Sequence, residues 1–367
     1  MAAYPKTWLF FTLFMASMPL EAPADALPPP AVAPVLQDGS HDFDFNVGGW
    51  KNHIRRRLHP LSGSDEWTEM NGTVVVSKIW GGKAQVEEIE ADGPLGHFEG
   101  MTLFTYNPEA RQWYMNYVGS GDGEVGEPEA GSFHDGRGEF YSHELFHGRA
   151  ILVRVVWSDI KPDSHRFEQS FSDDGGKTWE PNFIADLTRD SNAAAEATTP
   201  PVSDEPQQHG FDWQFGSWAI HMSRRMNPLT GSTTWTPLDG SVDVRKLWGG
   251  KANLAEIETQ GPSGHLQFLA LRLYNPEAKQ WNLLFAHSDD GVLNKPALIG
   301  EFHDGKGVFY DQEDFKGRAI LVRFTFQSLT ADSSRDEQAF SADGGKTWEV
   351  NWINDQTRAK PGQASGG

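Results

Sequence analysis

Charged residues recur at matching positions in the two halves of the chain, on segments rich in Val, Ile and Phe. The candidate site residues are Arg56, Glu88, Glu90, Arg154, Glu168, Arg224, Glu256, Glu258, Arg323 and Glu337. A charge on the buried face of a strand is costly unless it is paired. Two interpretations stay open. One is a structural ion pair, such as Arg154 with Glu168 across a hairpin. The other is a polar floor beneath a ligand held inside a barrel.

The same residues allow a second kind of chemistry. Glu88 and Glu90 are two positions apart on a predicted strand, which separates their side chains by about 6.5–7 Å. Two carboxyl groups at such a distance suit acid–base catalysis on a sugar, so a glycan hydrolase, a lyase or an isomerase remains an alternative. The sequence has no Ser-His-Asp order, phosphate loop or zinc motif.

Histidines also repeat, but their positions do not converge on one strand face. The pairs are His41/His209, His53/His221, His97/His265 and His134/His303. We therefore expect no metal ion and no cofactor. His59, His143 and His147 become Asn227, Gln312 and Lys316 in the second half, so a site that used them would exist only in the first.

The elements that position these residues come from a tandem repeat. Residues 80–84 (WGGKA) return at 248–252, residues 148–154 (GRAILVR) at 317–323, and residues 174–180 (DGGKTWE) at 343–349. Roughly half of the positions are identical, and the unit is far longer than a solenoid repeat. Each copy is therefore a whole domain, and a one-residue register shift near Gly131 and Gly300 places a small insertion in a loop.

Turn signals recur about every ten residues within each copy, as in a sandwich or barrel of hairpins. Examples are Asn107-Pro108 and Asp135-Gly136. No window holds a helical period. The sequence predicts an all-β protein with two tandem antiparallel barrels of about nine or ten strands each. On the first strand, Trp50, Ile54 and Arg56 alternate and are expected to face inward.

Two motifs carry a family resemblance. Phe-Asp-Phe-x2-Gly-x-Trp opens the first copy at residues 43–50, and Asp-Gly-Gly-Lys-Thr-Trp-Glu-x-Asn closes it at residues 174–182. The set resembles a bacterial family of uncharacterised calycin-like or lipocalin-like barrels. The resemblance covers nearly all of both copies and implies that Trp50 and Trp218 close the barrel floors against Arg189 and Arg358.

The closing motif also resembles the Asp-box of sialidase propellers, Ser-x-Asp-x-Gly-x-Thr-Trp. A propeller needs several such boxes, and each copy has one. We expect a structural hairpin in which Asp174 and Asp343 accept hydrogen bonds from turn amides, and in which Trp179 and Trp348 pack back.

Composition limits the environment and the partners. The 367-residue chain has no cysteine and a net charge of −20, which disfavours nucleic acid. Residues 1–26 read as a signal peptide, with a short apolar segment and an Ala24-Asp25-Ala26 cleavage site. No later stretch is apolar enough for a membrane span. The expected location is the periplasm or the exterior, and the oligomeric state is open.

The predicted organisation is a signal peptide (1–26), a Pro-rich leader (27–40), barrel domains (41–189 and 209–358), a linker (190–208) and a tail (359–367). The favoured function is the binding of a small organic or lipophilic ligand in the barrels. The alternatives are the secreted enzyme described above and a non-catalytic interaction module.

Overall fold

The computed structural model describes residues 38–121, 123–193, 205–262 and 264–359. The predicted signal peptide and most of the predicted leader and linker lie outside these ranges. From Asp38 onward the chain forms one compact unit. In the described ranges, no helix combines the length and the apolarity that a bilayer crossing needs.

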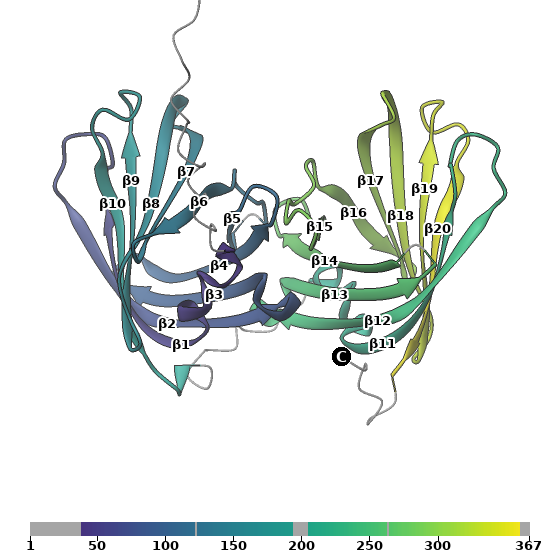
Figure 1. The fold of residues 1–367 in the computed structure, drawn as a ribbon, viewed down its shortest axis with the longest axis horizontal. Helices are drawn as coiled ribbons and strands as arrows, with labels where there is room; N and C mark the ends of the chain where they lie inside the picture. Colours follow the sequence, from purple (N-terminus) through teal and green to yellow (C-terminus); the bar gives the residue numbers. More distant parts are fainter. Residues whose placement is uncertain (1–37, 122, 194–204, 263, 360–367) are drawn as a thin grey trace, which may run out of the picture. The chain divides into compact units, whose positions relative to one another are not determined.

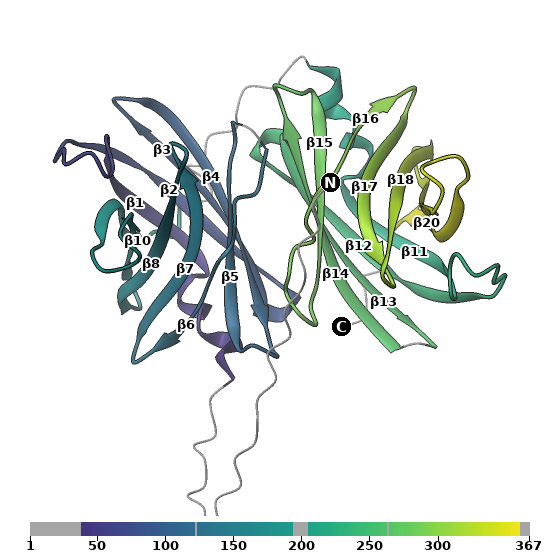
Figure 2. The same ribbon diagram turned by 90° about the horizontal axis from the view of Figure 1, so that it is seen from above.

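Each copy is a closed meander of ten antiparallel strands (Figures 1 and 2). The strands of the first barrel are β1 (Gly48–Arg57), β2 (Trp67–Ile79), β3 (Ala84–Gly93), β4 (Gly96–Asn107), β5 (Gln112–Gly119), β6 (Glu129–His134), β7 (Arg137–Phe146), β8 (Arg149–Lys161), β9 (Ser164–Ser172) and β10 (Glu180–Arg189). Strand β1 pairs with both β2 and β10, which closes the barrel. This confirms the predicted all-β fold of tandem antiparallel barrels.

The second barrel repeats the same order. Its strands are β11 (Gly216–Arg225), β12 (Trp235–Leu247), β13 (Ala252–Gly261), β14 (Gly264–Asn275), β15 (Gln280–His287), β16 (Leu298–His303), β17 (Lys306–Phe315), β18 (Arg318–Thr330), β19 (Ser333–Ser341) and β20 (Glu349–Arg358). Short 3-10 helices precede each barrel: η1 (Gly39–His41) and η2 (Asp44–Asn46) in the first, and η4 (Pro206–His209) and η5 (Asp212–Gln214) in the second.

Two-residue turns fix the register of several hairpins. Asp135 and Gly136 join β6 to β7 with φ angles of 52° and 75°. Two consecutive positive φ angles are the geometry of the hairpin turn whose twist matches the flanking strands, and Asp-Gly is a preferred sequence for it. Asp304 and Gly305 repeat the turn in the second barrel.

The floor of each barrel is closed by a Trp–Arg stack, as the family resemblance implied. The Arg189 guanidinium lies 3.6 Å from the centre of the Trp50 ring, and that of Arg358 lies 4.1 Å from the centre of Trp218. Arg189 also donates hydrogen bonds to the carbonyls of Val47 (2.6 Å) and Phe45 (3.0 Å). The stack therefore ties the last strand to the segment that enters the first.

The Asp-box hairpin is also confirmed. The Asp174 carboxylate accepts hydrogen bonds from the backbone amides of Lys177 and Thr178 and from the Thr178 hydroxyl. The Thr178 bonds lower the pKa of Asp174 to about 2. Trp179 packs back beneath the guanidinium of Arg154, 4.6 Å away, so this motif organises the outside of the barrel.

The two barrels share one hydrophobic cluster. It includes Val86 and Leu103 of the first barrel and Leu254 and Leu271 of the second, all fully buried. Polar contacts accompany it: the Asn282 amide donates to the Gly123 carbonyl at 2.9 Å. Strands β3 and β4 are therefore buried on their outer as well as their inner faces, and the barrels are not independent bodies.

Candidate ligand-binding cavities

The first barrel encloses a cavity of about 800 Å³. Its wall is mainly apolar and aromatic, with Val74, Ile89 and Phe167 among the lining residues. Beneath it, an aromatic layer that includes Phe43, Trp113 and Trp157 fills the floor of the barrel. A closed barrel with a cavity above a packed floor can bind a small molecule inside.

Glu87 is the least exposed acidic residue that lines this cavity and keeps only 5% of its exposure. The Asn46 amide and the Thr102 hydroxyl each donate a hydrogen bond to its carboxyl group, both at 3.2 Å. Burial raises the pKa of Glu87 to about 7, although these two hydrogen bonds oppose the shift. The group therefore titrates near neutral pH.

Glu129, the first residue of β6, lines the same cavity with 8% exposure. Burial, together with the neighbouring Glu144 of β7, raises the pKa of Glu129 to about 8. Burial also raises the pKa of Glu144. Adjacent carboxyl groups in a low-dielectric site resist ionising together, so Glu129 is mostly protonated at neutral pH.

The second barrel encloses a cavity of about 770 Å³ with a different set of buried polar groups. Arg272 donates to the Gln214 side chain at 2.5 Å and to the Asn253 side chain at 3.3 Å. Gln214 donates to Gln356 at 3.1 Å, and Gln356 donates to the Asp336 carboxylate. A chain of amides thus links a buried cation to a buried anion.

The pKa values of this network follow from its burial. Arg272 and Asp336 keep 3% and 7% of their exposure. Burial lowers the pKa of Arg272 to about 10 and raises that of Asp336 to about 7, while the opposite charge of each partner counters the shift. Arg272 also lies 4.4 Å from the centre of the Phe211 ring, which stabilises the guanidinium in its apolar surroundings.

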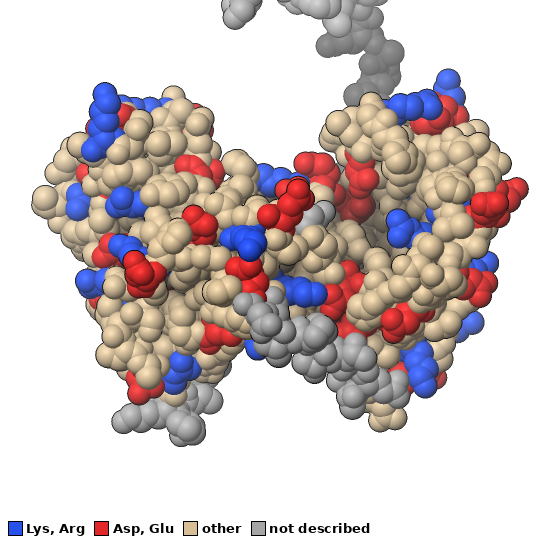
Figure 3. Space-filling view, turned by 180° about the vertical axis from the view of Figure 1, so that it is seen from behind, with Lys and Arg blue, Asp and Glu red and all other residues tan. Residues whose placement is uncertain are grey.

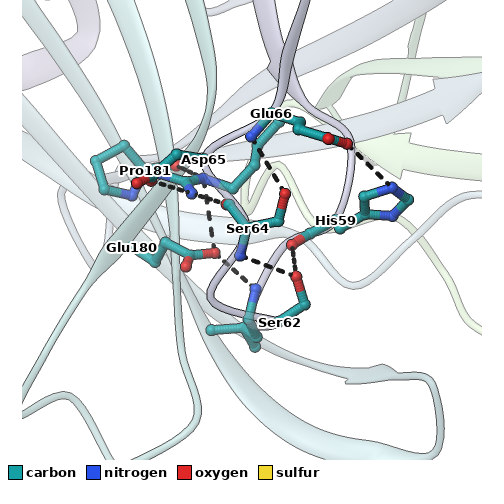
Figure 4. A network of polar contacts seen from close by, with 9 residues as sticks. His59, Ser62, Ser64, Asp65, Glu66, Glu180 and Pro181 are labelled. Atoms are coloured by element: carbon teal, nitrogen blue, oxygen red, sulfur yellow. Dashed lines mark hydrogen bonds and ion pairs between the residues drawn. The ribbon is translucent and has the colours of Figure 1, made fainter.

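A polar network holds the loop between β1 and β2 at the mouth of the first cavity (Figure 4). Arg57 donates to the Asp65 carboxylate at 2.9 Å and to the Pro181 carbonyl at 3.2 Å. The Leu61 amide donates to Glu180 at 2.6 Å. The second barrel repeats the last contact between Leu229 and Glu349 at 2.7 Å. Both mouths are thus held by side-chain bonds that do not depend on a ligand.

The outer surface mixes both charges, with acidic and basic side chains interspersed (Figure 3). In this view the first barrel is on the right, and its surface is hollowed there. A surface with both charges interspersed favours solubility.

Of the predicted site residues, Arg56 and Arg224 line the first and second cavities respectively, near the mouths. The others face away from the interior and require a correction. On β3 the inward side chains are Glu87 and Ile89, so Glu88 and Glu90 point outward. The same holds for Glu256 and Glu258 on β13, where Ile257 lines the cavity.

The outward carboxylates have structural surroundings. Arg245 of the second barrel attracts both Glu88 and Glu256, and opposes the rise in pKa that burial causes in each. Glu258 accepts a hydrogen bond from His265 at 2.7 Å. The acid pair that was predicted from the spacing of Glu88 and Glu90 is therefore not part of either cavity.

The predicted pair of Arg154 and Glu168 does not form. Strand register places Ser170 opposite Arg154 and Val156 opposite Glu168. Arg154 instead covers Trp179, and Glu168 lies 3.7 Å from Arg166. In the second barrel Arg323 likewise lies 4.5 Å from the centre of the Trp348 ring, and register places Ala339 rather than Glu337 opposite it.

The repeated histidines each contact a nearby polar side chain, such as His53 with Glu69 and His97 with Asp92. Across the described part of the chain, no group of three or more His, Asp or Glu could hold a metal ion. His165 is the buried exception: it lies against Trp50 at 4.3 Å, and burial lowers its pKa to about 3. It is therefore neutral.

The buried polar groups that sequence analysis missed differ between the copies. Glu87 and Glu129 correspond to Ala255 and Leu298, while Arg272 and Asp336 correspond to Phe104 and Phe167. A search for charges retained in both copies discards all four. A usable signal was present in β14, where Arg272 is the lone charge in the apolar run LALRLY at residues 269–274.

Comparisons with known proteins add no family. No family model matches the chain, and no curated sequence matches it. Among solved structures, the S-type phycobiliprotein lyase from Guillardia theta is 14% identical, with a TM-score of 0.30, over 43% of this chain and 99% of its own. A DUF3598 family protein of unknown function from Nostoc punctiforme is 10% identical, with a TM-score of 0.27, over 88% of this chain and 99% of its own.

Proposed function

We propose that the protein binds small organic ligands, one inside each barrel, and that the two cavities select different ligands. The observation that carries this proposal is that each closed barrel is hollow, with a volume of about 800 Å³ in the first and 770 Å³ in the second. Cavities of roughly 300–1,000 Å³ with mainly apolar walls and a few polar groups are typical of small-molecule sites.

The buried polar groups support binding rather than packing alone. Glu129 and Asp336 occupy positions that the other copy fills with Leu298 and Phe167. Since the barrel folds with an apolar residue at each position, a buried carboxyl group there adds a cost without being needed for the fold. Recognition of a ligand would offset that cost.

A titration with a neutral fluorescent probe tests the proposal. N-Phenyl-1-naphthylamine, added to the full chain, is expected to show enhanced emission and two saturable sites. Ala185→Trp fills the first cavity and Ala270→Trp the second, because each alanine lines its cavity. Each variant should lose one site and keep the other, with circular dichroism as the check of folding. Absence of any saturable binding would refute the proposal.

We further propose that the chain acts outside the cytoplasm and belongs among bacterial calycin-like proteins. The apolar segment and the Ala24-Asp25-Ala26 site support export. Fractionation of bacteria that express the full chain, followed by N-terminal sequencing, is the test. A mature protein that begins at Leu27 in the periplasm or medium is expected, and an uncleaved cytoplasmic product would contradict it.

A further inference from the structure

The first cavity has an acidic wall made by Glu129 and Glu144 on the adjacent strands β6 and β7. Glu129 is more than nine-tenths buried. Within the described residues, no other side chain hydrogen-bonds to its carboxyl group. The backbone amide of Glu129 itself donates a hydrogen bond to this carboxyl group. That bond offsets only part of the cost of burying the group, because two carboxyl oxygens can accept more than one hydrogen bond. Glu129 can therefore accept further hydrogen bonds from a partner that comes from outside the chain.

The basic side chains that line the cavity lie at its mouth, so none neutralises the acidic wall. Further acids face it: Glu87 on β3 and Glu124 and Glu127 in the loop before β6, while Tyr117 lies on the neighbouring strand β5. The bases that line the cavity are Arg56, Arg57, His59 and His147. Arg56, His59 and His147 are exposed at the mouth, and Arg57 is bonded to Asp65.

The remaining wall suits a cation that carries an apolar body. Aromatic rings line the cavity on several strands: Phe98, Phe167, Phe171, Phe183 and Trp157. Aromatic faces attract ammonium groups, and the attraction strengthens when water is excluded. Carboxylates accept hydrogen bonds from N–H donors of a cation at short range.

The second cavity lacks this combination. Leu298 replaces Glu129, Ala255 replaces Glu87, and the buried Arg272 places a positive charge where the first barrel has Phe104. A positive charge that is already buried repels a cationic ligand, although Asp336, Glu313 and Asp290 also line this cavity. The two cavities therefore differ in the buried charges that they present to a ligand.

We propose that the first cavity selects an organic cation, a primary ammonium on a flat apolar body, which Glu129 and Glu144 bind by hydrogen bonds, and that the second cavity does not. This inference rests on the proposed ligand-binding function and names the class of ligand for one of the two sites. No covalent step is involved.

Binding of a cation at this site should release a proton, which can be measured. With a pKa of about 8, Glu129 is mostly protonated at neutral pH in the free protein. An ammonium ion binds the ionised carboxylate, so binding releases a proton. The affinity for the cation should then rise as the pH approaches about 8 and level off above it, whereas the affinity for a neutral ligand of the same shape should stay constant.

Calorimetric titration of the full chain with two matched probes tests the inference. The probes are 1-naphthylmethylamine and 1-naphthylmethanol, at pH 8. The amine is expected to bind at least about tenfold more tightly than the alcohol. Glu129→Gln keeps the size of the side chain and should remove that advantage, while the affinity for the alcohol changes less than about threefold. Glu109→Gln, at an exposed turn, is the matched control and should leave both affinities unchanged.

The outcomes separate the two proposals. If the alcohol binds but the amine has no advantage, or if Glu129→Gln leaves the advantage intact, the cation site is refuted and ligand binding stands. If neither naphthyl compound nor the neutral fluorescent probe binds, both proposals fail. Titrations at pH 7 in two buffers of different ionisation enthalpy should show proton release in the wild type and less in Glu129→Gln. Equal release in both proteins would also overturn the inference.

Discussion

The two barrels share one frame and differ in what they bury inside it. Both have ten strands, a Trp–Arg stack at the floor, an Asp-box hairpin and a cavity of similar volume. Inside, the first barrel buries Glu87 and Glu129, while the second buries Arg272 and Asp336. The shared features stabilise the fold, so the differing ones are where two functions can diverge after a duplication.

The free-energy cost of burying these ionisable groups differs between the two barrels. In the first barrel, a buried carboxyl group can stay neutral by holding a proton. In the second, Arg272 stays charged at any physiological pH, because its pKa remains at about 10. The second interior therefore depends on its compensating partners, whereas the first does not.

The largest expected effect is in this second network. Asp336→Phe introduces the residue that the first barrel has at Phe167 and leaves the Arg272 charge buried without its anion. We expect a loss of about 3–5 kcal/mol in the free energy of unfolding, measured by denaturant melts of the full chain. The double variant Arg272→Phe/Asp336→Phe removes both charges and should recover at least about 2 kcal/mol of that loss. Additive losses would mean that the two groups are not coupled.

The floor stacks test whether the frame is equivalent in the two barrels. Arg189→Met and Arg358→Met each remove a cation–π contact and charged hydrogen bonds to three carbonyls. Each variant should lose about 2–3 kcal/mol in a denaturant melt. Arg149→Met, at an exposed surface pair with Asp173, is the control and should lose less than about 1 kcal/mol. A clear difference between the two floor variants would break the equivalence.

Titration of Glu129 should make the free energy of unfolding depend on pH through the first barrel. The pKa of Glu129 is about 8 in the folded chain, above the ordinary value of roughly 4.3 in an unfolded one. The folded state therefore holds this proton more strongly, and the stability that it contributes is complete below about pH 4 and is lost as the pH rises through about 8.

Glu129→Leu removes this dependence by inserting the residue found at Leu298. The stability gained by the variant relative to the wild type should be larger at pH 8 than at pH 6.5, by about 1.5 kcal/mol, in melts at both pH values. Glu109→Leu at an exposed turn should show no such change. If the stability gained by Glu129→Leu were the same at both pH values, the pKa of Glu129 would not be raised in the folded chain.

Sequence alone predicts the frame because the frame consists of local signals. Turn pairs such as Asp135-Gly136 set the hairpins, and the repeat reveals that two equal units exist. The faces of β3 were assigned one residue off. Val86 and Leu103 pack outward against the other barrel, so the apolar alternation that normally marks the inside is present on both faces.

The candidate interiors were missed for a different reason. Comparing the copies selects residues that stayed the same, such as Arg154 and Arg323, and these cover the Trp of an outer hairpin. Residues that make one cavity unlike the other are lost in that comparison. Which of the differing charges face inward depends on the face assigned to each strand, and on β3 and β4 the apolar contacts with the other barrel obscure that assignment.

The smallest expected effect concerns the outer pair of the second barrel. Arg323 lies over Trp348, and Ala339 rather than Glu337 is its register partner. Arg323→Met should therefore lose only the cation–π contact, about 0.5–1 kcal/mol at a partly exposed site. Glu337→Gln should lose less than about 1 kcal/mol, and the double variant should equal the sum of the two within about 0.5 kcal/mol. Denaturant melts of the four proteins measure this cycle. A coupling energy of several kcal/mol would mean that Arg323 and Glu337 contact each other. The charges that repeat in both copies would then be paired, as the sequence analysis expected.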